Sequence, residues 1–352
     1  MRSRNGHNGD GRAGEGRATL ATIATSAGVS VATVSKVLNG RYGVSAATSA
    51  RVQAVIDELG YEASLVAQSL RNHRTNVIGI LVADLEPFST ELLKGAADAI
   101  RGSGFELVVY SAGGRSSARQ GWERRYLSRL SGTLIDGAVL VTPTVVDVRY
   151  GAPIVAVDPH TGPTDLPTID SDNRTGARLA TEHLLELGHR RIAMLTGRAD
   201  LQSAQLREEG YRQAMAAAGL PVTADLLRVG GYDPQISADA VRLLLSEVDR
   251  PTAIFAANDV TALTTVAVAR ELGLRVPDDL SVVGFDNVPD SALCDPPLTT
   301  VEQPIQEMGR LATAMLIELI EERPVERTHV TLPTRLVVRW SATAPVTASP
   351  AS

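Results

Sequence analysis

The chain reads TLATIATSAGVSVATVSKVLN at residues 19–39, and this stretch predicts two short helices joined by a tight turn. Thr19 is of a type that caps helix N-termini. Apolar side chains follow it at helical spacing, at Leu20, Ile23, Ala24 and Ala27. Gly28 supplies the turn, because glycine adopts a left-handed backbone without steric cost. The stretch therefore indicates a helix-turn-helix near the N-terminus, although ordinary helical hairpins share this pattern.

The second of these helices begins after Ser30, and its two faces differ in character. Val34, Val37 and Leu38 lie along one side, and small or polar residues are available on the other. Small, uncharged residues at a helix start allow it to approach base edges in the major groove. We expect base-edge contacts from Val31, Ala32 and Lys36. We expect contacts with phosphates or groove walls from Thr33, Ser35 and Asn39.

A third helix is predicted over residues 45–59, with Gly60 as its stop. Three short helices would make a compact DNA-binding domain over residues 18–62. A further short helix within 64–72, starting at Ser64, would form a hinge in a linker at 63–75. A helix this short is not stable alone in water, so we expect it to form only on DNA.

Charge separates the N-terminal part from the rest. Residues 1–75 contain nine Lys or Arg and five Asp or Glu, a net charge of +4. The whole chain has 34 basic and 40 acidic residues, which leaves a net charge of −10 on residues 76–352. An acidic protein with a basic end is expected to touch phosphates with that end only.

The first block, with VS, a third helix, GYEASLVAQSLR and NVIGILV after it, resembles the lactose-repressor family of bacterial transcription regulators. Later blocks match the family's pattern in the same order: HLLELGHRRIAML, AIFAAND, LRVPDDLSVVGFDN and PPLTTVEQP. The resemblance implies a ligand-responsive repressor of sugar uptake or catabolism genes, which binds palindromic operator DNA as a homodimer. We expect further DNA contacts from Thr19, Leu20, Ser30, Thr48, Ala67 and Leu70. On DNA, Leu70 would wedge into the minor groove.

Residues 76–345 alternate between apolar runs rich in Val and Ile and amphipathic helical stretches. This alternation predicts an α/β fold, with parallel sheets covered by helices on both faces. About 270 residues is too many for one sheet, so two lobes are expected. The family resemblance adds a periplasmic-binding-protein-like arrangement, in which the chain crosses between the lobes near 171–173, 302–305 and 333–335.

Ligands of such folds bind beyond the carboxyl ends of the strands, here in the cleft between the lobes. Sugars are bound by charged planar groups, which make paired hydrogen bonds to adjacent hydroxyl groups, and by aromatic faces, which pack against the sugar ring. The candidates at strand ends or following helix starts are Phe88, Ser89, Asp158, Asp172, Arg207, Tyr232, Asn258 and Asp286. The family's effector contacts map onto Phe88, Arg207, Tyr232, Asn258 and Asp286. Several have alternative roles: Asn258 and Asp286 as helix caps, Phe88 as core, and Arg207 as the partner of Glu208 or Glu209 on the surface.

Composition argues against several other classes. The single cysteine, Cys294, allows neither a disulfide framework nor a cysteine-based metal site. No apolar run approaches the length of about 18 residues that a membrane span needs. Residues 1–17 lack the apolar core of a secretion signal and indicate a disordered arm, and residues 346–352 a disordered tail. We therefore expect a cytoplasmic protein.

No common catalytic or dinucleotide-binding motif is present, and we expect neither an enzyme, a cofactor nor a metal. His183 and His189 are more simply explained as exposed or capping residues than as metal ligands. Two further hypotheses remain: a sugar-binding transport protein of the periplasmic type, and an enzyme of this fold with an added DNA-binding domain. The predicted helix-turn-helix and the missing signal peptide disfavour the first. The second has no candidate nucleophile.

Overall fold

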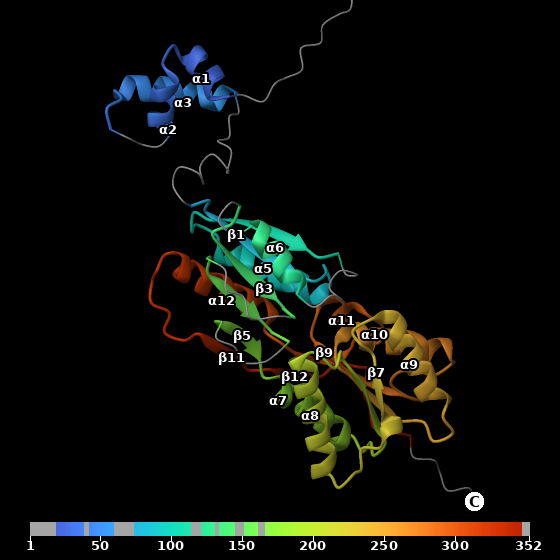
Figure 1. The fold of residues 1–352 in the computed structure, drawn as a ribbon. Coiled ribbons are helices and arrows are strands. Elements are labelled where there is room, and N and C mark those ends of the chain that lie inside the picture. Colours follow the sequence, from blue (N-terminus) through green and yellow to red (C-terminus); the bar gives the residue numbers. More distant parts are fainter. Residues whose placement is uncertain are drawn as a thin grey trace, which may run out of the picture. The chain divides into compact units, whose positions relative to one another are not determined.

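The computed structural model describes residues 19–38, 42–59, 74–113, 121–130, 134–144, 151–160 and 166–346 (Figure 1). The chain divides into two compact units between Arg71 and Asn72. This division falls inside the predicted linker at 63–75. The predicted arm, hinge helix and most of the tail lie outside the described residues.

The first unit, called the head below (residues 19–59), contains the helices α1 (Leu20–Ala27), α2 (Val31–Leu38) and α3 (Ala46–Leu59). Thr19 Oγ1 accepts a hydrogen bond from the backbone N–H of Thr22 at 3.2 Å, and Gly28 ends α1 with φ +65°. The axes of α1 and α2 are bent by 103°, within the range of helix-turn-helix pairs. The buried core consists of Ile23, Ala24, Ala27, Val34, Val52 and Ile56. The predicted helix-turn-helix is confirmed.

The second unit contains two six-stranded sheets. The first has the strand order β11-β5-β4-β3-β1-β2, and its neighbouring strands are all parallel. Its strands are β1 (Val77–Val82), β2 (Glu106–Ser111), β3 (Gly137–Val141), β4 (Ile154–Val157), β5 (Thr168–Ser171) and β11 (His329–Leu332). The helices α5 (Pro87–Ala99) and α12 (Ile305–Ile320) pack on one face, and α6 (Trp122–Leu130) packs on the other. This sheet and these helices are the N-lobe.

The second sheet has the order β12-β10-β9-β8-β6-β7. Its strands are β6 (Ile192–Thr196), β7 (Leu227–Val229), β8 (Ala253–Ala256), β9 (Ser281–Asp286), β10 (Thr299–Glu302) and β12 (Arg335–Val337). The helices α7 (Asn173–Glu186) and α8 (Gln202–Ala217) cover one face. The helices α9 (Pro234–Ser246) and α10 (Asp259–Glu271) cover the other. With the short helices η1 (Ala224–Leu226) and α11 (Pro289–Leu293), they form the C-lobe.

The chain crosses between the lobes three times, as predicted. The crossings follow β5, β10 and β11, at residues 172, 303–304 and 333–334. In Figure 1 the C-terminal elements α12 and β11, in orange to red, accordingly lie beside β3 and β5 of the N-lobe. The prediction of parallel sheets needs one correction, because β12 pairs antiparallel with β10. It enters the sheet directly from β11 of the other lobe, without the crossover helix that a parallel return needs.

Two helices of the lobes begin in the same way. Helix α5 begins at Pro87, because Glu86 caps it by accepting a hydrogen bond from the N–H of Ser89. Likewise, α9 begins at Pro234, with Asp233 as its cap. Both starts use a proline in the first turn, where its missing N–H is harmless. Among the described residues, no single helix is both long and apolar enough to span a membrane.

Candidate functional site

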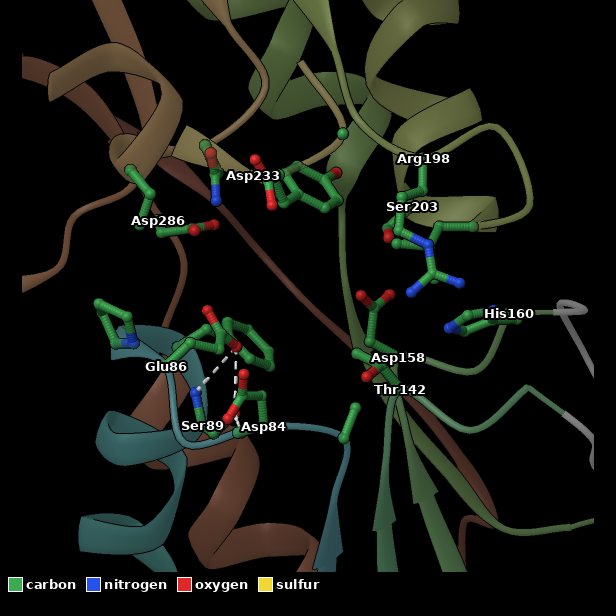
Figure 2. Close-up of a pocket in the computed structure, with 18 of the residues that line it drawn as sticks. Asp84, Glu86, Ser89, Thr142, Asp158, His160, Arg198, Ser203, Asp233 and Asp286 are labelled. Carbon is green, nitrogen blue, oxygen red and sulfur yellow. Dashed lines mark hydrogen bonds between the residues drawn. The ribbon is translucent and has the colours of Figure 1, made fainter. Parts of the chain in front are cut away.

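A cavity of about 600 Å³ lies between the two lobes, at the carboxyl ends of their strands (Figure 2). From the N-lobe, Asp84 follows β1, Thr142 follows β3 and Asp158 follows β4. From the C-lobe, the loops after β6, β7 and β8 and the end of β9 line the opposite wall. This is the position that the fold class predicts for a ligand site.

Four cavity residues have a left-handed backbone that is uncommon for side chains other than glycine: Thr142, Asp158, Tyr232 and Asp286, with φ of 47°, 49°, 62° and 114°. Each stands at or just after a strand end. Such backbones cost free energy and persist where the surrounding structure enforces them, often at binding sites. The strand ends are thus bent so that these residues turn into the cavity.

Arg207 lies in the first half of α8 and is buried, with 4% of its surface exposed. Its Nε donates to Asn173 Oδ1 at 2.8 Å, and one terminal nitrogen lies 3.5 Å from Asp286 Oδ1. The guanidinium stacks 3.9 Å from the ring centre of Phe285. The alternative of a surface pair with Glu208 or Glu209 is therefore wrong. Arg207 is held at the cavity wall by contacts from α7 and from β9.

Two carboxyl groups share the surroundings of Arg207. Burial raises the pKa of Asp286 well above its usual range, and the charge of Arg207 opposes this rise. Asp286 also accepts a hydrogen bond from Gln303 Nε2 at 2.6 Å. It is no helix cap, because the residue that precedes α11 is Val288. Burial likewise raises the pKa of Asp158, against the charge of Arg207 and a hydrogen bond from Ser203. An acidic ligand would meet carboxyl groups on both walls, whereas hydroxyl groups can donate to them.

The aromatic residues of the cavity are placed close to the backbone or to the core. The ring of Tyr232 lies against Gly197, where a Cβ atom would come within 2.3 Å of the Tyr232 hydroxyl oxygen. That hydroxyl has no hydrogen-bond partner among the described residues, and burial raises the pKa of Tyr232 to about 12. Phe88 lines the cavity and also belongs to the N-lobe core. Phe88 therefore lies in the core, and its position at the cavity leaves its effector contact as a prediction.

Polar residues at helix starts complete the predicted set. Asn258 lines the cavity, and its side chain also caps α10 by accepting a hydrogen bond from the N–H of Thr261 at 2.9 Å. Ser89 lines the cavity too, and its hydroxyl donates to the carbonyl oxygen of Asp84 at 2.8 Å. Asp172 is not brought into this cavity. It caps α7 through the N–H of Thr175 and lines a separate small cavity of about 140 Å³.

Several lining residues were absent from the sequence prediction, among them Trp122, Thr142, Thr144, His160, Arg198 and Ser203. Thr142 and Arg198 follow strands closely, so the strand-end rule could have found them. Trp122 carries no such signal, because it opens a helix far from its strand. His160 lies in the loop after β4 and bridges the lobes: its Nδ1 is 3.2 Å from Asp200, which also pairs with Arg198. Burial lowers the pKa of His160 to about 4.

The predicted DNA-contacting residues form a surface on the head. Val31 is 46% exposed, Ala32 and Lys36 are exposed, and Thr33 and Ser35 are half-buried. Ser30 Oγ accepts a hydrogen bond from the N–H of Thr33 at 3.1 Å, so the helix start is capped as expected. Leu20 packs partly against the head core, and Thr48 Oγ1 is 2.9 Å from Ser45 Oγ. Asn39, Ala67 and Leu70 lie outside the described residues.

The candidate histidines have different surroundings. His189 is buried and bonded by Thr252, Ser281 and the carbonyl oxygen of Thr343, so it fastens the C-terminal segment rather than being exposed. Burial lowers the pKa of His183. In the part of the chain that the structure describes, no group of three or more His, Cys, Asp or Glu is placed to hold a metal ion.

Comparison with known proteins agrees with this architecture. Residues 19–64 match the family described as bacterial regulatory proteins, lacI family, and residues 181–342 match the periplasmic binding protein-like domain. The ribose operon repressor of Halalkalibacterium halodurans is 36% identical over 328 residues, which cover 91% of this chain and 96% of that protein.

Two solved structures are also similar over most of the chain. A lac repressor dimer bound to operator and the anti-inducer ONPF has a TM-score of 0.79 at 30% identity, covering 93% of this chain and 99% of that one. A complex of the transcriptional regulator CelR with cellobiose has a TM-score of 0.68 at 34% identity, covering 93% and 100%. With its helix-turn-helix head and two-lobed binding domain, the chain belongs to the lacI family of bacterial transcription regulators.

Proposed function

We propose that the chain is a repressor of genes for sugar uptake or breakdown, and that an uncharged sugar in the interlobe cavity changes its affinity for operator DNA. The observation that carries the proposal is the buried group of Arg207, Asp286 and Asp158 at the cavity wall. The guanidinium of Arg207 offers several N–H donors, and the two carboxyl groups can accept hydrogen bonds. Together they suit the adjacent hydroxyl groups of a sugar. Relatives whose names mention ribose and cellobiose support the ligand class.

The proposed DNA contacts come from the exposed side of α2. Val31 and Ala32 can offer only apolar contacts, such as to a thymine methyl group. Lys36 would then carry the hydrogen-bonded reading of a base. A homodimer would place two heads on a palindromic operator, and Leu70 of the hinge segment would wedge into the minor groove at its centre. A regulator of this kind acts on the chromosome, which makes the cytoplasm its proposed compartment.

The alternatives from other classes have less support. A periplasmic sugar-binding transport protein would share the two lobes but has no use for a helix-turn-helix head. Relatives with the names ribose operon repressor and PurR, an HTH-type transcriptional repressor, support a repressor rather than an enzyme.

The test is a gel shift with the promoter next to the protein's own gene, with and without candidate sugars. We expect specific binding by the parent protein and a change in apparent affinity when a sugar occupies the cavity. Asp158→Asn is the matched variant, because asparagine adopts the left-handed backbone of Asp158 readily. It should bind the promoter normally and respond only at higher sugar concentration. An unchanged response of Asp158→Asn would place the effector elsewhere.

A further inference from the structure

Trp122, the first residue of α6, has an unusual place in the cavity wall. It lines the cavity with 4% of its surface exposed, and its indole Nε1 has no hydrogen-bond partner among the described residues. A buried N–H that gives up water without gaining an acceptor costs free energy, and tryptophan N–H groups usually find a partner when buried. Since Trp122 lines the cavity, a ligand oxygen is a partner that suits this donor.

The indole is held in a fixed position. Its ring packs edge-on against Tyr126, with 5.9 Å between the ring centres. On either side of Trp122, Gly121 donates its N–H to Thr144 Oγ1 at 2.9 Å, and Thr144 Oγ1 donates to the buried carboxylate of Glu123 at 3.1 Å. These two hydrogen bonds attach the start of α6 to the segment that follows β3. A fixed donor is suited to recognition, because little side-chain freedom is lost on binding.

Trp122 belongs to the end of the cavity away from Asp286. Thr144 links it to the loop after β4, because the N–H of His160 donates to the carbonyl oxygen of Pro143 at 3.0 Å. Figure 2 shows His160 and Thr142 on one side of the cavity and Asp286 on the other. Trp122, Thr144, His160 and Arg198 are therefore called the Trp122 end. Arg207, Tyr232 and Asp286 are called the Arg207 end.

The Trp122 end is polar but balanced in charge. Arg198 makes two hydrogen bonds to Asp200, at 3.1 Å and 2.7 Å. The lowered pKa of His160 leaves its imidazole neutral near pH 7. An aromatic ring beside neutral and paired polar groups fits an uncharged, hydroxyl-bearing ring rather than a phosphate or a carboxylate.

We infer that the cavity holds two linked sugar rings, one at each end, so that the effector is an uncharged disaccharide. This inference rests on the proposed function. One ring would bind at the Arg207 end, and the second would accept a hydrogen bond from Trp122 Nε1. A volume of about 600 Å³ leaves room for both rings. Sites that bury ligands larger than one such ring measure roughly 300–1,000 Å³.

The test compares matched sugars on the full-length protein by isothermal titration calorimetry: glucose with cellobiose, and xylose with xylobiose. Trp122→Phe keeps the aromatic ring and removes the N–H. Trp340→Phe is the control, because the chain's other tryptophan is 74% exposed and does not line the cavity. We expect a disaccharide to bind at least about tenfold tighter than its monosaccharide. Trp122→Phe should weaken that disaccharide by about three- to tenfold and leave the monosaccharide unchanged, and Trp340→Phe should change neither.

Equal affinity of mono- and disaccharide, or an equal loss of both in Trp122→Phe, would overturn the two-ring inference and leave the proposed function standing. Failure of all four sugars to bind would overturn the proposed function and the inference with it. A second measurement does not depend on the folding of Trp122→Phe. In Trp340→Phe, Trp122 is the only tryptophan, and the disaccharide should change its fluorescence more than the monosaccharide does. No change with a bound disaccharide would contradict the inference.

Discussion

The head and the interlobe cavity present their recognition groups in opposite ways. On the head, Val31, Ala32 and Lys36 are exposed on a helix whose other side supplies the core. In the cavity, Arg207 and Asp286 are buried and already paired with each other and with neighbouring groups. The difference follows from the binding partners. A side chain that contacts a DNA groove must stand on the outer surface of the protein, whereas a small ligand is bound in an enclosed cavity.

Because of this difference, substitutions of the exposed head residues should affect DNA binding alone, whereas substitutions of the cavity residues should affect both ligand binding and stability. Exposed residues of the head can be exchanged with little effect on folding. The cavity residues are part of the packing and hydrogen bonding of the two lobes, so their exchange affects both binding and stability. The head depends instead on its small core, and the first prediction concerns that core.

Ile23→Ala should have the largest effect. Ile23 is fully buried in a core of six residues, and a truncation of this kind costs about 2–5 kcal/mol. A domain of this size has little stability to spare. We expect the head to unfold and operator binding to be lost in a gel shift, while the second unit keeps its melting temperature and sugar affinity. Leu59→Ala, on the exposed end of α3, is the control. A parallel loss of sugar binding in Ile23→Ala would contradict the independent folding of the two units.

Arg207→Ala should be next in size and should affect two properties at once. It leaves Asp286 buried without its charge partner, which costs about 3–5 kcal/mol of stability, and it removes the donors proposed for the sugar. We expect a lower melting temperature of the second unit and no response to sugar, with operator binding retained below that temperature. Arg212→Ala is the control on the same helix, because Arg212 pairs with Glu208 at the surface. An Arg207→Ala protein with unchanged sugar affinity would refute the assigned site.

The contrast between head and cavity also shows how far sequence reasoning could reach. The head was predicted nearly to its helix bounds, because caps, turn and apolar spacing are all local. The two lobes, their crossings and seven of the residues that line the cavity followed from strand ends and from family resemblance. Asp172 was misplaced because its position near a crossing does not reveal that its side chain faces the N–H of Thr175.

Other features could not be found without coordinates. The buried state of Arg207 depends on Asn173 of α7 and on Phe285 and Asp286 of β9, which are distant from Arg207 in the chain. Hydrogen bonds of Gly121 and Glu123 with Thr144 fasten the start of α6, with Trp122, to the segment that follows β3. Such positions are set by tertiary packing, and no spacing in the sequence encodes them.

Lys36→Ala tests the exposed side of the comparison. Lys36 lies on the outer face of α2, so its removal should leave the melting temperature of the head unchanged. We expect a loss of base preference at one position of each half-site, worth about 1–3 kcal/mol of discrimination, in a binding assay with operator variants. Arg51→Ala, an exposed cation on α3, is the comparison variant. Equal weakening on all sequences would reduce Lys36 to a phosphate contact.

The pH dependence of stability should also differ between the two units. The pKa of His160 in the folded state, about 4, lies below the usual value of 6.5. The unfolded chain therefore binds more protons in this window, and stability is lost as pH falls from 6.5 towards 4. For the second unit we expect a loss of up to about 2 kcal/mol from this residue between pH 7 and pH 5. His160→Gln should flatten the curve in thermal unfolding. The described head residues include no histidine, so its stability should change little over this range.

The central claim is that the cavity and the head are coupled, and the most direct measurement is a reciprocal titration. Operator affinity is measured with and without the tightest-binding of the four sugars, and sugar affinity with and without operator. Coupling requires the same factor in both directions. We predict equal factors for the parent protein and a factor near one for Arg207→Ala. A sugar that binds the cavity of the parent with the same affinity in the presence and absence of operator, and leaves operator binding unchanged, would contradict the account.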